Sequence, residues 1–210
     1  MRRKIMVLGI ICLFIGAGVV PSLADKTEKS NIQVDCVNDD VDQSQTDQDS
    51  LGIVCSWYIW AQSFVPSKEM LTGVQLLLQR HGFIRSDLKV SIKNDLYGED
   101  LTTLSIPYDN VPKVKFPYYL WSSNFDWISF DFPDISVSPG ETYYITLYTD
   151  RGLGVRLASL SSYGWGNSHN PDSYLNGESW FSNVQGNTPT PWKIWDSPFD
   201  FCFKTLYTEI

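Results

Sequence analysis

One stretch of the chain, residues 157–192, combines side chains that suit the recognition of a neutral polar ligand. It contains six aromatic residues, many Asn, Gly, Ser and Pro residues, and neither Lys nor Arg. Aromatic rings can pack against the C–H faces of a pyranose, while amide and carboxylate groups pair with its hydroxyls. A phosphate group would find no cationic partner here. The stretch therefore indicates carbohydrate recognition and argues against nucleic acid.

The candidate ligand-binding residues are the aromatic and amide side chains of this stretch: Trp165, Asn167, Tyr174, Asn176, Trp180 and Trp192. The competing interpretation is that the Trp residues belong to a hydrophobic core, because a Trp in a β-sandwich is on average highly buried. Tyr163 and Trp165 are two residues apart, as side chains on one face of a strand would be. We expect the loops 167–176 and 183–192 to hold the site.

Catalytic signatures are weak. Gly166-x-Ser168-x-Asn170 resembles a nucleophile elbow, but Asn replaces the second Gly. His169 stands directly beside Ser168, whereas the base of a triad comes from elsewhere in the chain. Neither Cys55 nor Cys202 has the local signature of a cysteine protease. We expect a protein that is not an enzyme.

Metal and cofactor signatures are also weak. The chain has no C-x-x-C pair and only two His residues, so a zinc site is not expected. A structural Ca²⁺ is an alternative, held by Asp95, Glu99 and Asp100 in one loop or by Asp172 with Asn170. Solvated turns are the favoured explanation of these residues, because Asp and Asn favour turns without any metal. No cofactor is expected.

The N-terminus has the pattern of a secretory signal peptide. A basic start, Arg2–Lys4, precedes an apolar run, 6–20, and then Pro21 and small residues that end at Ala24. We predict a signal peptide over 1–24 and a secreted or cell-surface protein, with an uncleaved anchor as the alternative. No transmembrane domain is expected in the mature chain.

The cysteines that remain after cleavage are Cys36, Cys55 and Cys202. An oxidising compartment allows one disulfide among them and leaves one thiol over. The pairs Cys36–Cys55 and Cys55–Cys202 are both open.

Acidic residues dominate the chain beyond the signal peptide. The full sequence has a formal net charge of −8, and removal of 1–24, which carries three basic residues and no acid, leaves −11. Such a protein repels phosphate backbones and anionic lipid. The segment 25–52 is rich in Asp and free of aromatic residues, and it is predicted to be a flexible tether. The domain is expected to span 53–210.

Beyond the tether, apolar and polar residues alternate with period two. One such face consists of Val74, Leu76 and Leu78. The others consist of Leu88, Val90 and Ile92, of Ile128, Phe130 and Phe132, of Tyr143, Ile145 and Leu147, and of Phe199, Phe201 and Phe203. Gly and Pro bound these runs. The pattern predicts an all-β protein, an antiparallel β-sandwich. The segment 107–119 has too many prolines for a central strand and is expected to connect strands over one end of the sandwich.

The order of several short motifs resembles a known group. They are Ala61-Gln62-Ser63-Phe64, Leu71-Thr72-Gly73-Val74, Ser86-Asp87-Leu88, Val137-Ser138-Pro139-Gly140, Tyr163-Gly164-Trp165-Gly166 and Asp200-Phe201-x-Phe203. Together they are similar to the secreted jelly-roll modules, galactose-binding-like and carbohydrate-binding-module-like, of bacterial and archaeal surface proteins. The resemblance covers roughly 57–207. It implies a jelly-roll sandwich and a non-catalytic module that binds a polysaccharide or glycan, or a structural or protein-interaction domain with a surface-protein partner and no small ligand.

Overall fold

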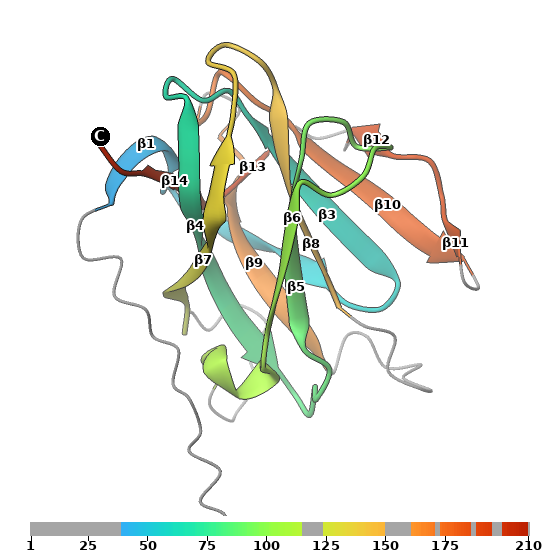
Figure 1. The fold of residues 1–210 in the computed structure, drawn as a ribbon. Coiled ribbons are helices and arrows are strands. Elements are labelled where there is room, and N and C mark those ends of the chain that lie inside the picture. The colour runs from blue at the N-terminus through green and yellow to red at the C-terminus, as the bar shows by residue number, and fades with distance from the viewer. Residues whose placement is uncertain are drawn as a thin grey trace, which may run out of the picture. The chain divides into compact units, whose positions relative to one another are not determined.

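The alternating runs fold into two antiparallel sheets that pack face to face (Figure 1). The computed structural model describes residues 39–114, 124–149, 161–170, 173–185, 188–194 and 199–209. The predicted signal peptide, Cys36 and Asp172 lie outside these ranges. Within them, the only helical element is one 3₁₀ turn, η1 (Tyr108–Asn110). The prediction of an all-β, antiparallel sandwich is confirmed.

The first sheet contains seven strands: β1 (Asp40–Gln45), β2 (Ser50–Val54), β4 (Met70–His81), β7 (Asp126–Ser136), β9 (Ser162–Ser168), β13 (Asp200–Phe201) and β14 (Phe203–Tyr207). The long strand β4 organises it, because β4 pairs with β7, with β14 through Gly73–Leu76 and with β9 through Leu78–His81. Strands β1 and β2 pair with β14 and β9 respectively.

The second sheet also contains seven strands: β3 (Tyr58–Phe64), β5 (Leu88–Lys93), β6 (Thr102–Ile106), β8 (Tyr143–Thr149), β10 (Ser179–Gln185), β11 (Thr188–Pro189) and β12 (Lys193–Ile194). Its order is β11-β10-β3-β8-β5-β6, and β12 also pairs with β10. From β3 to β10 the chain alternates between the sheets, except for the β5–β6 hairpin, which stays in the second sheet. Each sheet is thus assembled from segments far apart in sequence.

The core lies between the sheets and is filled by the faces that period two predicts. Val74, Leu76 and Leu78 of β4 are fully buried, and Ile145 and Leu147 of β8 meet them from the second sheet. Burial of such side chains stabilises the fold by roughly 1.5–3 kcal/mol each relative to full exposure. The sandwich is held together mainly by this shared apolar interior.

The tether predicted over 25–52 must be corrected in its second half. Residues 40–45 and 50–54 are strands β1 and β2, whose backbones pair with β14 and β9. Gln45 is buried, and a Cβ at Gly52 would stand 2.6 Å from the Phe201 ring, so this position needs glycine. Asp40 and Asp42 therefore lie on β1, a strand at the end of the order of the first sheet. Charged side chains are common on such edges.

The cysteines that the structure describes are not bonded to each other. Cys55 and Cys202 are both buried thiols, so the Cys55–Cys202 alternative is not formed. Burial raises the pKa of Cys55, and it raises the pKa of Cys202 to about 12, where the carboxylates of Asp47 and Asp49 act in the same direction. Buried thiols of this kind are unreactive, because the thiolate is the nucleophile.

The connection after β6 runs over one end of the sandwich as far as the structure describes it. η1 lies at the lower end of the molecule in Figure 1. The backbone of Lys113 then forms an isolated parallel β-bridge with Arg80, near the end of β4. The predicted end-crossing connection is thus seen over 107–114. Among the described residues, no helix has the length and apolar character needed to span a membrane.

Candidate functional site

The six predicted ligand-binding residues fall into two regions. Trp165 and Asn167 lie on β9 in the first sheet, and Tyr174 and Asn176 lie in the connection from β9 to β10. Trp180 lies on β10 in the second sheet, and Trp192 lies just before β12. The continuous stretch 157–192 is thus divided between the interior of the sandwich and an outer surface.

Trp165 belongs to the interior. It has no exposed surface, and its ring stacks on Phe201 with 4.1 Å between centroids and 16° between planes. Its indole N–H donates to the carbonyl of Cys202 at 2.9 Å. A ligand at the surface cannot contact this ring.

The other residues of the first region are also mostly enclosed. Asn167 is buried on β9, where its neighbours in the ladder are Ser50 and Phe201. Tyr174 is buried edge-on against Phe203, and its hydroxyl donates to Gln43 Oε1 at 3.1 Å. Asn176 alone is exposed. Of the four predicted residues in this region, only Asn176 presents its side chain to solvent, so they form no aromatic platform.

Beneath Tyr174 lies a buried carboxylate that joins the two sheets. Asp200 accepts hydrogen bonds from Gln62 Nε2 at 3.0 Å, Ser173 Oγ at 3.1 Å and the Tyr174 N–H at 3.2 Å. Burial raises the pKa of Asp200, and these three donors oppose the rise without cancelling it. The carboxylate is satisfied inside the fold, which marks it as a structural group.

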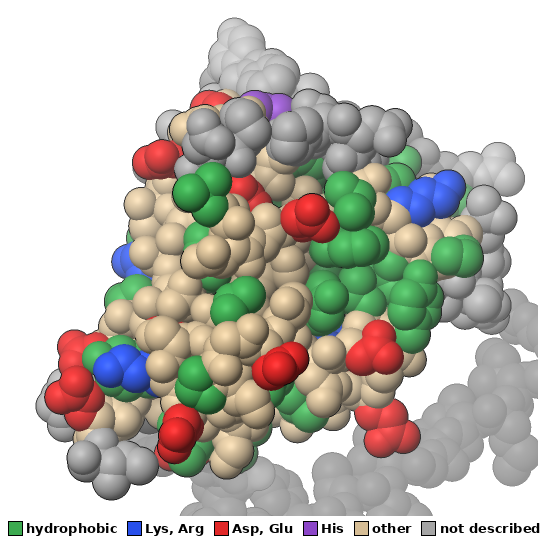
Figure 2. All heavy atoms as spheres, turned by 90° about the horizontal axis from the view of Figure 1, so that it is seen from above, with side chains coloured by type: hydrophobic (Ala, Val, Ile, Leu, Met, Phe, Trp, Pro, Cys, Tyr) green, Lys and Arg blue, Asp and Glu red, His purple; other side chains and the backbone are tan. Residues whose placement is uncertain are grey.

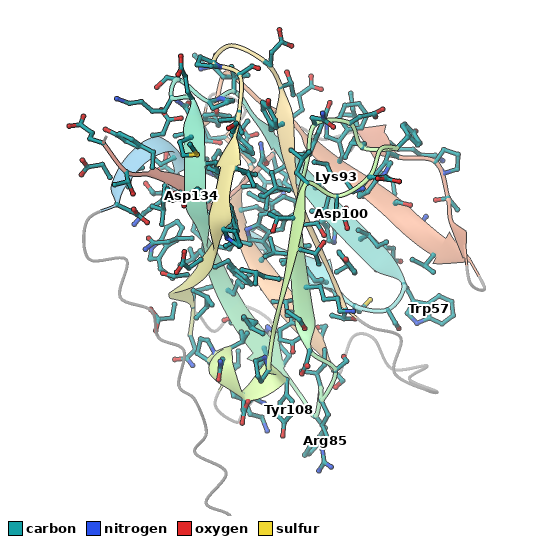
Figure 3. All side chains as sticks on the ribbon, in the orientation of Figure 1. Trp57, Arg85, Lys93, Asp100, Tyr108 and Asp134 are labelled. Carbon is teal, nitrogen blue, oxygen red and sulfur yellow. The ribbon has the colours of Figure 1, made fainter. Side chains whose placement is uncertain are left out.

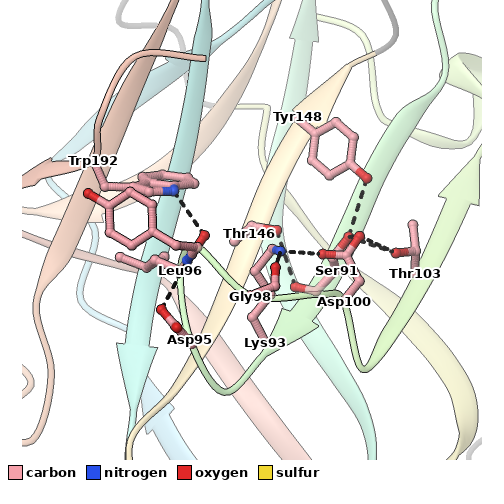
Figure 4. A network of polar contacts seen from close by, with 11 residues as sticks. Ser91, Lys93, Asp95, Leu96, Gly98, Asp100, Thr103, Thr146, Tyr148 and Trp192 are labelled. Atoms are coloured by element: carbon pink, nitrogen blue, oxygen red, sulfur yellow. Dashed lines mark hydrogen bonds and ion pairs between the residues drawn. The ribbon is translucent and has the colours of Figure 1, made fainter. Parts of the chain in front are cut away.

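Trp180 and Trp192, by contrast, lie on neighbouring segments of the second sheet, and both are partly exposed. β12 pairs with β10 so that Ile194 stands opposite Trp180, and Trp192 immediately precedes β12. The Trp192 indole N–H donates to the carbonyl of Leu96 at 3.1 Å, which ties this segment to the β5–β6 loop (Figure 4). The Trp180 indole N–H has no hydrogen-bond partner among the described residues.

Tyr144 from β8 completes this surface. It alternates with the inward-facing Tyr143 and Ile145, so its ring points away from the core. The rings of Tyr144 and Trp180 meet edge to face, with 6.5 Å between centroids and 82° between planes. Period-two alternation could have identified Tyr144, but its distance in sequence from residue 157 hid the association.

We use the name aromatic face for the surface formed by Tyr144, Trp180 and Trp192 together with the exposed Tyr97 and Ile194. Each of the first three is partly exposed, Tyr97 is 70 % exposed and Ile194 is 48 % exposed. Figure 2 shows hydrophobic side chains gathered on one side of the top of the molecule, the side where Figure 1 places the β5–β6 loop and β12. Rings from three separate segments thus share one accessible surface.

An ion pair beside the aromatic face orders the β5–β6 hairpin (Figures 3 and 4). Lys93 Nζ lies 2.8 Å from Asp100 Oδ1 and also donates to the Gly98 carbonyl at 2.6 Å. Asp100 Oδ2 accepts from Ser91 Oγ and Thr103 Oγ1. Burial acts to raise the pKa of Asp100, but the hydrogen bonds and the positive charge of Lys93 outweigh it and lower the pKa.

Two further carboxylates border the aromatic face. Burial raises the pKa of the Tyr144 hydroxyl, and the negative charges of Asp95 and Glu178 raise it further. Both carboxylates are exposed. The backbone amide of Tyr97 donates to Asp95 Oδ1 at 3.0 Å, which holds Asp95 in the turn after β5. The Tyr144 part of the aromatic face is therefore bordered by negative charge.

The weak catalytic and metal signatures acquire structural explanations. Ser168 is buried, and its Oγ accepts from the Asn170 N–H at 3.2 Å, while His169 is exposed with its ring Nδ1 3.1 Å from Asp49 Oδ1. Of the proposed Ca²⁺ ligands, Asp100 is paired with Lys93 and Asp95 caps its turn. Within the described ranges, no three His, Cys, Asp or Glu side chains gather as a metal site would require.

Comparisons with known proteins assign no family. No protein-family profile matches the chain, and no curated protein matches it. Among solved structures, a chain described as "Structure of infectious bursal disease virus Gx strain" is similar at 12% sequence identity and a TM-score of 0.31. The match covers 80% of this chain and 39% of that one. The TM-score is too low for this likeness to bear on function.

Proposed function

We propose that this protein is a secreted, non-catalytic recognition module of the jelly-roll, carbohydrate-binding type, and that it binds a glycan at the aromatic face. The observation that carries the proposal is the convergence of Tyr144, Trp180 and Trp192 from three separate segments on one outer surface, with part of each ring accessible. Of the residues predicted from sequence, Trp180 and Trp192 remain in the proposed site, and Tyr144 joins them.

The chemistry of the aromatic face suits a sugar ring. Partly exposed indole and phenol rings provide a surface for pyranose C–H groups, and they are already ordered by strand pairing and by the Trp192–Leu96 hydrogen bond. The carboxylates of Asp95 and Glu178 stand at the border, where they can accept hydrogen bonds from hydroxyls. A few polar groups around an aromatic surface are the usual composition of a small-ligand site.

A glycan array with three proteins tests the proposal. We expect the wild type to bind at least one glycan class, Trp180→Ala to lose that binding, and Trp57→Ala to keep it. Trp57 is a suitable control because it is another Trp with 49 % exposure, located on the β2–β3 turn away from the aromatic face (Figure 3). If the wild type binds no glycan on the array, the proposal that the protein binds a sugar is contradicted.

The alternative is a protein-interaction domain, and one observation favours it. Tyr97 and Ile194 are large apolar residues that remain well exposed beside the Trp residues. Exposed apolar patches of several hundred Å² often mark protein contacts. A protein partner that is captured by the wild type and lost by Ile194→Asp, together with a blank glycan array, would support this alternative.

The non-catalytic and secreted parts of the proposal have their own tests. A screen of ester and glycoside substrates is expected to show no turnover, and turnover abolished by a single Asp, Glu or His substitution would contradict this. N-terminal sequencing of protein recovered from the medium is expected to begin at Asp25, as the predicted signal peptide requires. Protein retained in cells with its first 24 residues intact would contradict export by cleavage.

A further inference from the structure

We propose that the ligand of the aromatic face is a cationic glycan, one whose sugar carries a protonated amino group. This inference rests on the proposed function and narrows its ligand class. It is argued from the arrangement of charge around Tyr144, which is set by the register of four adjacent strands.

The register places carboxylates on both sides of the Tyr144 ring. Ser63 is the ladder neighbour of Tyr144 on one side, and its backbone N–H donates to the carbonyl of Glu178 at 2.9 Å. The Glu178 N–H returns a bond to Ser63 Oγ at 2.7 Å. Lys93 is the ladder neighbour on the other side, and Asp95 follows it by two residues. Glu178 is therefore held next to Ser63 on one side of Tyr144, and Asp95 stands in the turn after β5 on the other side.

The positive charges nearest to these two carboxylates do not neutralise them. Lys93 is bound by Asp100 and by the Gly98 carbonyl, so its charge is already matched. Lys193 on β12 is exposed, but its ladder neighbour is Phe181, and the charges that act on Tyr144 are those of Asp95 and Glu178. Glu99 adds another exposed carboxylate to the β5–β6 loop. The charges that act on the Tyr144 hydroxyl are therefore negative.

A negative field over aromatic rings favours a cation for two reasons that act together. The face of an indole or phenol ring attracts a cation through its quadrupole, and nearby carboxylates add a direct Coulomb attraction. A neutral sugar would use the apolar faces of the same rings and offer its hydroxyls to the carboxylates, but it would gain no Coulomb attraction between opposite charges. An anionic sugar would be repelled by Asp95 and Glu178. An amino sugar matches both the aromatic surface and the charge.

Binding of two matched oligosaccharides to the purified protein tests the inference. The probes are β-1,4-linked glucosamine and N-acetylglucosamine tetramers, which differ in the charge of the amino group. The measurement is calorimetric titration at about pH 5.5, which is above the reference pKa values of Asp and Glu and low enough to protonate a sugar amine. We expect the glucosamine tetramer to bind about tenfold more tightly, the gain that a partly desolvated cation–aromatic contact provides.

Three variants locate the effect. Glu178→Gln and Asp95→Asn each remove one charge while keeping the backbone bonds of Glu178 and an acceptor for the Tyr97 N–H, and each is expected to reduce the preference to about threefold or less. Asp134→Asn removes the same charge from the exposed surface of β7 in the first sheet, and it is expected to leave the preference unchanged (Figure 3). Trp180→Ala is expected to abolish binding of the glucosamine tetramer.

Each contrary outcome has a definite meaning. Equal binding of the two tetramers, or tighter binding of the acetylated one, overturns the cationic ligand and leaves glycan binding intact. Binding of neither tetramer overturns the cationic inference, and the glycan array then decides the proposed function separately. If Asp134→Asn reduces the preference for the glucosamine tetramer as much as Glu178→Gln does, the preference arises from the net charge of the protein. That result also overturns the inference.

Discussion

Trp165 and Trp180 are 15 residues apart and have the same side chain, yet they serve two different regions of the molecule. Trp165 stacks on Phe201 in the interior and bonds to a backbone carbonyl, whereas Trp180 meets Tyr144 on the outer side of the second sheet, and its indole N–H has no partner within the described part of the chain. The comparison shows that an aromatic-rich stretch does not define a site. The sheet to which each strand belongs, and the face on which each side chain lies, assign the role.

The largest expected effect concerns the interior. Trp165→Ala should lower the free energy of unfolding by about 3–5 kcal/mol, because it removes a fully buried ring and leaves a cavity against Phe201. Urea denaturation measures this, with Trp57→Ala as the exposed control. If Trp165→Ala lowered the free energy of unfolding no more than Trp57→Ala does, the interior role of Trp165 would be contradicted.

A second interior change should cost somewhat less. Asp200→Ala leaves the Gln62 amide, the Ser173 hydroxyl and the Tyr174 N–H without their acceptor, so we expect a loss of about 2–3 kcal/mol. Asp134→Ala, at an exposed carboxylate, should change stability by roughly 0.5 kcal/mol or less. Equal effects of the two substitutions in urea denaturation would show that the Asp200 network adds nothing to stability.

On the aromatic face, a substitution should affect ligand binding strongly and stability only weakly. Trp180→Ala is expected to lower the free energy of unfolding by only about 1 kcal/mol, because the ring is partly exposed, while ligand binding is lost. Thermal unfolding and the glycan array, run on the same preparation, make the comparison. A stability loss as large as that of Trp165→Ala would place Trp180 in the structural region and remove it from the proposed site.

The smallest expected effects are in pH dependence, and they have opposite signs in the two regions. The folded pKa of Asp200 is raised above its ordinary value of 3.8, so its contribution to stability is complete below that value and is lost as pH rises through the raised pKa. The folded pKa of Asp100 is lowered, so its contribution is present above 3.8 and is lost as pH falls through the lowered pKa.

Urea denaturation across the acidic range can separate the two carboxyl groups. Asp200→Asn should remove the pH dependence of the free energy of unfolding only above pH 3.8. Asp100→Asn should remove it only below pH 3.8. The Asp100 effect should be the smaller, because the side chain is 34% exposed and solvent screens its pairing with Lys93. If both variants removed the pH dependence of stability over the same pH range, the assignment of one range to each carboxyl group would be wrong.

The core faces of the strands were predictable because burial of one sheet face imposes period two. Val74, Leu76 and Leu78, and likewise Leu88, Val90 and Ile92, are buried as their alternation predicts. β9 could not be interpreted in this way, since every residue from Ser162 to Ser168 is buried. Neighbouring groups also cover its second face, where Gly164 lies against Gln79 and Gly166 against Leu77. Alternation carries no information about burial where both faces of a strand are covered.

The first two strands were missed for a different reason. Their sequence, from Asp40 to Val54, is polar and acidic at its start, which is the usual composition of a linker. Their pairing depends on backbone groups of β14 and β9, more than 100 residues away. Backbone hydrogen bonds leave little trace in side-chain composition, so an edge strand of this kind is hard to recognise from the local sequence.

The sequence by itself determined the alternating apolar faces, and with them the antiparallel sandwich, as well as an acidic chain whose aromatic stretch lacks cations. Those properties follow from local periodicity and composition. Only the tertiary structure decided that Trp165 stacks inside, that Trp180 meets Tyr144 outside with Trp192 on the neighbouring segment, and that Asp95 and Glu178 border that surface. The physical reason is strand register: pairing of β3 with β8 and of β8 with β5 brings together residues that are remote in sequence.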